Sequence, residues 1–174
     1  MTYRVVAAAS AAASLAGLVA GCSGGGGAAL ARQTLTFSER QNDGSFSFVD
    51  NPPKSSAAGG EPKLSPGDQL TFTADLIDRS GKDVGDLDAS CTVTATTTGS
   101  SDDSRAQCVG TADIPAGSLT LTVGGKAFGA GTTRGAVVGG TGDYAGATGS
   151  FTSSDENGTD KPSQDTFRLF IPKQ

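Results

Sequence analysis

Strict alternation of apolar and polar residues recurs along most of the chain, and it constrains the fold more than any other feature of the sequence. A period of two places every second side chain on one face of an extended strand, whereas a helix needs a period of 3.6. No stretch has a convincing helical period. The clearest runs place their apolar members at Leu35 and Phe37, Phe46 and Phe48, Leu70 to Leu76, Cys91 to Ala95, Leu119 to Val123, and Phe167 to Ile171.

Turn-forming residues separate these runs, and weaker strands are expected near 105–112, 135–139 and 147–153. The pattern predicts about eight or nine antiparallel strands whose apolar faces must be buried by closing or stacking the sheet. A closed barrel of about eight strands is either filled by side chains or holds one small ligand. Parity predicts these interior, pocket-lining residues: Leu35, Phe37, Phe46, Phe48, Leu70, Phe72, Ala74, Leu76, Val93, Leu121, Phe167 and Leu169.

The N-terminal segment is expected to be a targeting signal. Arg4 precedes an apolar run, Val5–Ala20, that is short for a membrane span and typical of a signal peptide. The run ends in Leu18-Val19-Ala20-Gly21-Cys22, which resembles the lipobox of bacterial lipoproteins. The resemblance implies a signal peptide over 1–21, lipidation of Cys22 and a location outside the cytoplasm at the cell membrane. An ordinary signal peptide with an incidental cysteine is the alternative.

The 174 residues are enough for one ordinary domain. Residues 22–33 are rich in glycine and alanine and predict a flexible tether, which leaves 34–174 for the barrel. Polar loops are expected over 51–64 and 154–164.

Composition excludes several functional classes. The formal net charge is −5, so a basic nucleic-acid surface is not expected. Histidine is absent, which removes every mechanism that uses an imidazole, including Ser-His-Asp hydrolysis. The aspartates between 75 and 88 lack the spacing of a calcium loop, so no metal site is predicted.

Cys91 and Cys108 are equidistant from the turn-like run 97–104. Residues equidistant from a hairpin turn face each other across antiparallel strands. We therefore predict a cross-strand disulfide, which an extracytoplasmic location permits. Two free buried thiols are the alternative.

Two segments resemble the superfamily of allene oxide cyclases and dirigent proteins, in its bacterial branch. The first runs from Pro66-Gly67-Asp68 through Gly81-Lys82 to Cys91, and the second is Gly139-Gly140-Thr141-Gly142-Asp143-Tyr144. The resemblance implies an all-β, eight-stranded antiparallel barrel with an apolar cavity. Members include cyclases, which close a fatty-acid epoxide, and dirigent proteins, which steer phenoxy-radical coupling. These chemistries require no metal or organic cofactor, and plant members often form trimers, so a homotrimer is one expectation.

The residues of the plant cyclase site are not reproduced here. Aligning the first strand on Gly44-Ser45 places Phe37 at the cyclase glutamate and Glu39 at an asparagine. Ala74 stands at the second asparagine, and Cys91 matches a cysteine that lines the cyclase pocket. Specific allene oxide cyclase activity is therefore not predicted.

Two residues remain as candidate catalytic groups. Glu39 continues the inward face of Leu35 and Phe37, and a carboxylate at the mouth of an apolar barrel could act as an acid or base. A solvated Glu39 at the end of its strand is the alternative. Tyr144 could hold a ligand oxygen at a pocket rim, or it could be a packing aromatic on a glycine-rich turn.

Three functional hypotheses follow from the sequence. The first is an envelope-anchored barrel that binds an apolar small molecule without chemistry. The second is a cofactor-free cyclase or isomerase that controls substrate shape and uses a carboxylate or phenol. The third is a filled barrel that serves as a structural module of the envelope. The volume of the cavity separates the third hypothesis from the other two.

Overall fold

A computed structural model describes residues 29–41, 45–51, 64–97, 100–126, 131–154 and 162–173. Nearly all of these residues belong to one antiparallel sheet, and a single turn of 3-10 helix, η1 (Gly142–Tyr144), joins two of its strands. In these ranges, no helix reaches the length and apolar character needed to cross a membrane. The strands are β1 (Leu30–Gln41), β2 (Ser47–Val49), β3 (Gln69–Ile77), β4 (Asp83–Thr97), β5 (Ser100–Ile114), β6 (Gly117–Lys126), β7 (Thr132–Gly140), β8 (Thr148–Ser154) and β9 (Gln164–Pro172).

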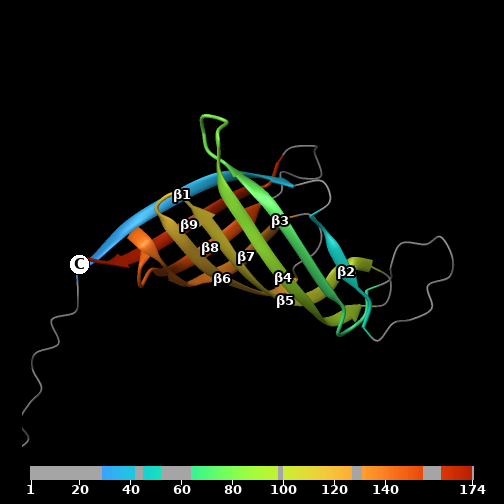
Figure 1. The fold of residues 1–174 in the computed structure, drawn as a ribbon. Coiled ribbons are helices and arrows are strands. Elements are labelled where there is room, and N and C mark those ends of the chain that lie inside the picture. Colours follow the sequence, from blue (N-terminus) through green and yellow to red (C-terminus); the bar gives the residue numbers. More distant parts are fainter. Residues whose placement is uncertain are drawn as a thin grey trace, which may run out of the picture.

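The sheet closes into a barrel because β1 pairs with strands on both of its sides (Figure 1). Most of β1 pairs with β9, and its last residues, Ser38–Gln41, pair with the end of β3. The short strand β2 pairs with the beginning of β3 and so continues the line of β1 along the same edge. β1 and β2 therefore share one position in the ring, and the predicted eight-stranded antiparallel barrel is confirmed.

Alternate side chains of the strands pack inside the barrel in two clusters. The larger cluster is built around Phe167, which is fully buried and contacts Phe37 and Phe151 at ring-centroid distances of 6.0 and 5.1 Å. The smaller cluster surrounds the pair Cys91 and Cys108. The alternating apolar residues of the sequence form both clusters, so the side chains that were predicted to face inward do face inward.

One boundary differs from that expected. β1 begins at Leu30, and Leu30–Gln33 pair with Leu169–Pro172 of β9, so the end of the predicted tether belongs to the sheet. Backbone pairing to β9 extends the strand into a segment that lacks hydrophobic alternation. The signal peptide over 1–21, the lipidation site Cys22 and most of the two predicted loops lie outside the described residues.

The buried carboxylate of Asp68 holds the segment before β3 in place. It accepts hydrogen bonds from the backbone amides of Ser65 and Asn51 at 2.5 and 3.0 Å, and from Ser65 Oγ at 3.0 Å. The side chain is fully buried, so these bonds satisfy a group that would be costly to bury alone. Asp68 therefore has a structural role at the junction of β2, β3 and the segment between them.

Candidate functional site

A cavity of about 370 Å³ lies inside the barrel. Its deep end is formed by buried Leu87, Leu121 and Phe151, and exposed Gln41 and Phe46 mark its mouth. Its wall has two chemically different sides. The apolar lining residues come mainly from β3 to β6, with Phe46 before β2 and Phe151 on β8. The polar ones come from β1, β7, β8 and Ser163, which immediately precedes β9. Lining residues are Glu39, Gln41, Phe46, Leu70, Phe72, Leu87, Ala89, Cys91, Cys108, Gly110, Leu121, Val123, Thr133, Phe151, Ser153 and Ser163.

Small side chains on β4 and β5 leave space for the cavity. Ala89 faces Gly110 across the two strands, and both residues line the open volume. A Cβ added to Gly110 would come within 3.0 Å of the backbone oxygen of Asp88. Because Ala89 lines the cavity, a larger side chain in its place would extend into the open volume.

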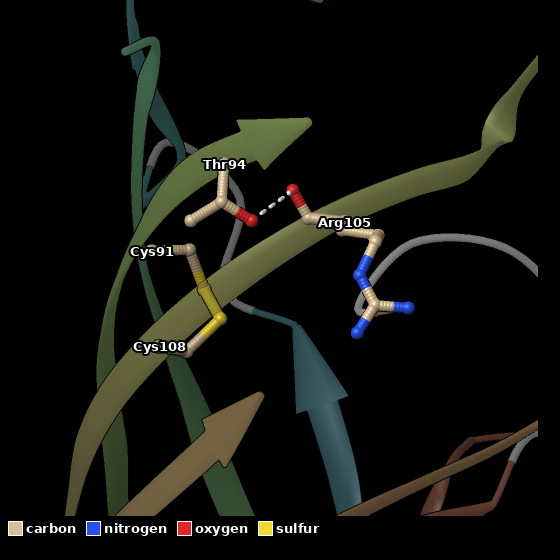
Figure 2. Close-up of a disulfide and its surroundings, with 4 residues drawn as sticks. All are labelled: Cys91, Thr94, Arg105 and Cys108. Atoms are coloured by element: carbon tan, nitrogen blue, oxygen red, sulfur yellow. Dashed lines mark hydrogen bonds between the residues drawn. A yellow bond between two sulfur atoms is a disulfide. The ribbon is translucent and has the colours of Figure 1, made fainter. Parts of the chain in front are cut away.

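The predicted disulfide between Cys91 and Cys108 is confirmed (Figure 2). It forms part of the apolar wall of the cavity. The two residues are directly opposite each other in the β4–β5 register, with their Cα atoms 4.0 Å apart. Nearby, Thr94 Oγ1 donates a hydrogen bond to the backbone oxygen of Arg105 at 3.2 Å. The β4–β5 hairpin, which contributes much of the apolar wall, is thus held together by the disulfide as well as by its backbone hydrogen bonds.

Glu39 lines the polar side of the cavity and is partly buried. It lies in β1, which continues to Gln41, so the strand does not end before this carboxylate. The backbone amide of Glu39 donates to the backbone oxygen of Ser163 at 2.7 Å, which places the two residues side by side. Hydroxyl groups of Thr133, Ser153 and Ser163 share this side of the cavity.

A second carboxylate lies next to this group and was missed in the sequence. Asp165 is fully buried, and its strand alternates with Phe167 and Leu169 toward the interior. It is directly opposite Phe37 on β1 and Ser153 on β8. Extending the parity of Phe167 by two residues toward the N-terminus would have found it.

The predicted pocket residues divide into two groups. Phe46, Leu70, Phe72 and Leu121 line the cavity. The others are not part of the cavity wall. Ala74 is fully buried, and the rest pack in or against the two core clusters: Leu35, Phe37, Phe48, Leu76, Val93, Phe167 and Leu169. The inward faces of the strands extend beyond the cavity. The alternation in the sequence therefore identifies inward-facing residues but does not distinguish those that line the cavity from those that pack in the core.

Tyr144 does not line the cavity. It is 5% exposed and belongs to the larger core cluster, because η1 folds back toward the barrel and buries the ring. Burial raises the pKa of Tyr144, and the charge of neighbouring Asp143 raises it further. The structure therefore supports the packing interpretation of Tyr144, and we assign it no role at the site.

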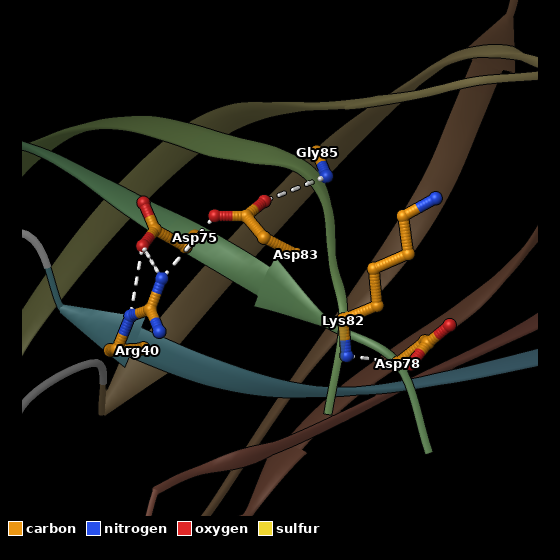
Figure 3. Close-up of polar contacts among 6 residues, drawn as sticks. All are labelled: Arg40, Asp75, Asp78, Lys82, Asp83 and Gly85. Carbon is orange, nitrogen blue, oxygen red and sulfur yellow. Dashed lines mark hydrogen bonds and ion pairs between the residues drawn. The ribbon is translucent and has the colours of Figure 1, made fainter. Parts of the chain in front are cut away.

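Arg40, the residue after Glu39, is exposed and connects the strands where the barrel closes (Figure 3). Arg40 Nε donates to Asp75 Oδ2 at 2.9 Å, its Nη2 bonds to the same oxygen, and Nη2 lies 3.3 Å from Asp83 Oδ2. The hydrogen bond to Asp75, followed by the charge of Asp75, raises the pKa of Arg40. This group joins β1 to β3 and β4, where β1 has only a short ladder.

The turn between β3 and β4 is held by another carboxylate, Asp78 (Figure 3). Its Oδ1 accepts hydrogen bonds from Ser80 Oγ at 2.6 Å and from the Lys82 amide at 3.0 Å. These bonds lower the pKa of Asp78, with the Ser80 hydroxyl as the largest cause. In the described parts of the chain, no three Cys, Asp or Glu side chains are grouped so that they could hold a metal ion.

The closed barrel and its interior cavity define a class of small β-barrel proteins in which one compartment of ligand size lies within the sheet. The sequence model of one family, described as the allene oxide cyclase barrel like domain, matches residues 48–166. The chain belongs to this family. The search of curated proteins found no match.

Solved structures with the same fold include several enzymes. A pyocyanin demethylase is 24% identical, with a TM-score of 0.63 over 79% of this chain and 99% of that chain. A pterocarpan synthase dirigent protein is 16% identical, with a TM-score of 0.59 over 84% and 93% of the two chains. An exo-specific intermolecular Diels-Alderase is 12% identical, with a TM-score of 0.58 over 80% and 98%. At these identities the likeness establishes the fold.

Proposed function

We propose that the barrel binds an apolar small molecule in its interior cavity. The observation that carries the proposal is the open volume of about 370 Å³, which lies within the range of small-molecule sites. A filled structural barrel would need large inward side chains where the chain has Ala89 and Gly110. The cavity therefore favours a ligand over the structural alternative.

Binding of the fluorescent tricyclic 9-anthracenemethanol tests this proposal. Ala89→Phe should fill the cavity and weaken binding by about tenfold or more, because the ring would occupy the space the probe needs. Thr92→Phe adds the same ring on the outer face of β4 and should bind as the unchanged chain does. Far-UV circular dichroism checks that each variant folds, and Ala89→Leu is a milder filling variant. Equal affinity in the filled and control variants would refute the proposal.

Catalysis is the second candidate function, and the position of Glu39 favours it. A partly buried carboxylate at the wall of an apolar cavity can act as a general acid or base if the substrate lies within hydrogen-bonding reach. Proteins with this fold include enzymes named for a cycloaddition and for pterocarpan synthesis. The corresponding reaction here would be a cofactor-free cyclisation or isomerisation of an apolar substrate.

Glu39→Gln tests the catalytic candidate, with any compound that native mass spectrometry finds bound to the purified barrel as the substrate. The variant keeps the size of the side chain and removes its proton-transfer capacity. We expect conversion of that compound to fall by about 100-fold or more, within the usual contribution of general acid-base catalysis. Unchanged conversion in Glu39→Gln would remove Glu39 from the catalytic role, and no conversion by the unchanged chain would leave binding as the function.

We also propose that the chain is a lipoprotein anchored to the cell membrane outside the cytoplasm through Cys22. The sequence Leu18–Cys22 supports this proposal, and a disulfide is expected in an oxidising compartment. The full chain in a bacterial host should incorporate labelled palmitate and sediment with membranes. Cys22→Ser should abolish both. Label retained in the variant, or an unlabelled soluble full chain, would contradict the anchoring.

A further inference from the structure

The Cys91–Cys108 disulfide is enclosed by the protein and borders the cavity. Cys91 is 3% exposed and Cys108 is 8% exposed, and both residues line the open volume. A small molecule inside the cavity can therefore contact the disulfide. The thiol of another folded protein needs much more exposed surface to reach it, because the rate of thiol–disulfide exchange depends on access to the sulfur atoms.

The disulfide lies in the middle of a row of inward residues that crosses four strands. Leu70 on β3 is directly opposite Cys91, and Val123 on β6 is directly opposite Cys108. All four residues line the cavity. A molecule that contacts the disulfide therefore also contacts hydrocarbon on either side of it, which favours an apolar molecule over a polar one.

The next row along the same strands leaves space beside the disulfide. In this row Ala89 is directly opposite Gly110, and the two small residues are flanked by Phe72 and Leu121. These four residues also line the cavity. Rows on one face of a sheet are about 7 Å apart, so a ring held over Ala89 and Gly110 can place a substituent against the disulfide.

We propose that the disulfide is a reactive site for small apolar thiols that enter the cavity. This inference rests on the proposed binding function and adds to it a reaction and a chemical class of substrate. The thiolate of the bound molecule attacks one cysteine sulfur and forms a new sulfur–sulfur bond with it. The Cys91–Cys108 bond breaks, its electron pair stays on the other cysteine sulfur, and that thiolate takes up the proton that the incoming thiol lost.

The reaction is reversible because the β4–β5 ladder keeps the two cysteines directly opposite each other. The released cysteine can attack the mixed disulfide in turn, which re-forms the Cys91–Cys108 bond and frees the thiol. This cycle uses no external oxidant. Detection of the mixed disulfide therefore requires a reagent that blocks the released cysteine before it returns.

Two alkyl thiols test the inference: 9-anthracenemethanethiol, the thiol counterpart of the binding probe, and 2-mercaptoethanol, which is small, neutral and polar. The Cys22→Ser chain is used, because its remaining cysteines are the two in the disulfide. N-ethylmaleimide added at intervals blocks the released cysteine, and mass spectrometry measures the opened chains. One probe and one maleimide on a chain identify the mixed disulfide.

The rate with each thiol is divided by the rate of the same thiol with oxidised glutathione, which corrects for intrinsic reactivity. We expect the normalised rate of the anthracene thiol to be about tenfold or more above that of 2-mercaptoethanol, because binding holds the thiol beside the disulfide. The rate should level off at high concentrations of the anthracene thiol. 9-Anthracenemethanol should slow the reaction as a competitor, since it fills the same space and has no thiol.

Filling the space beside the disulfide locates the reaction in the cavity. Ala89→Phe should lower the normalised rate of the anthracene thiol towards that of 2-mercaptoethanol. Thr92→Phe, on the outer face of β4, is the matched control and should leave the rate unchanged. Far-UV circular dichroism checks that both variants fold, and competition by the alcohol gives the same information on the chain without either substitution.

The outcomes separate the inference from the function on which it rests. Failure of 9-anthracenemethanol to bind would overturn the proposed binding function and the inference with it. Binding of the alcohol together with equal normalised rates for the two thiols would overturn the inference alone, because thiols that reach the disulfide only when the barrel unfolds react in proportion to their intrinsic rates. A faster anthracene thiol that the alcohol does not slow would also overturn the inference, since the reaction would then occur outside the cavity.

Discussion

Removal of the Cys91–Cys108 disulfide should lower the free energy of unfolding by about 3 kcal/mol. The two cysteines are separated by 17 residues, so the bond closes a loop whose chain entropy in the unfolded state accounts for that value. The folded barrel should survive the change, because the β4–β5 ladder aligns the two positions without the covalent bond. The loss should therefore appear as lower stability and not as a different fold.

Urea unfolding followed by far-UV circular dichroism measures this loss, since the chain has no tryptophan. For a small protein the denaturant slope is about 1–3 kcal/mol per molar urea, so the midpoint should fall by about 1–3 M in the Cys91→Ala/Cys108→Ala double variant. The unchanged chain reduced with dithiothreitol should shift by a similar amount. An unchanged slope with a midpoint shift below about 0.5 M would refute the loop-closure reasoning.

Three further results are expected. Phe167→Ala should cost about 3–5 kcal/mol of unfolding free energy because the ring is fully buried, whereas Phe170→Ala on the partly exposed face should cost less than about 1 kcal/mol in the same urea assay. Gly85→Ala should destabilise by about 1–3 kcal/mol, since φ is +153° and a Cβ would lie 1.9 Å from a backbone oxygen of β5, and Gly139→Ala, in open space, should not. Burial raises the pKa of Tyr144 in the folded protein, so folding favours the neutral phenol. The contribution of Tyr144 to the free energy of unfolding is therefore complete below the ordinary pKa of 10.0 and is lost as the pH rises through the folded pKa. Tyr144→Phe should remove that alkaline loss in thermal melts while leaving probe binding unchanged, and weakened binding would contradict the packing assignment.

The strands and their inward faces could be predicted because successive side chains of a strand point to opposite faces, so apolar residues alternate with polar ones along the sequence. The runs around Phe72, Val93 and Phe167 all lie in strands with the predicted side inward. The disulfide could be predicted for a related reason, since the symmetric placement of Cys91 and Cys108 about a turn determines the register.

The size of the cavity could not be predicted, because parity gives the direction of a side chain and not the space around it. The first half of β4 was also missed, and the reason is physical. Its inward residues include Ala89, which is small where the cavity needs space, and its outward residues include Asp86 and Asp88, which resemble a polar loop. Cavity-lining positions carry small side chains, which leave the cavity open and also weaken the hydrophobic pattern of the strand.

The polar side of the site was found only in part. Glu39 continues a clear apolar run, so its inward position could be predicted. Asp165 precedes the first apolar member of its run, and a charged residue at a strand end is ordinarily solvated. The parity of Phe167 gives the direction of the Asp165 side chain, but its burial depends on the pairing of β9 with β1 and β8.

Native mass spectrometry tests the central claim, that the barrel holds a small molecule, most directly. The chain from Ser23 onward, secreted from its own host, should carry a reproducible extra mass of one small compound, and Ala89→Phe should lose it. The same spectrum gives the number of subunits. A bare chain mass in both proteins, unchanged after incubation with host lipid extract and with 9-anthracenemethanol, would contradict the account and leave a barrel without a ligand.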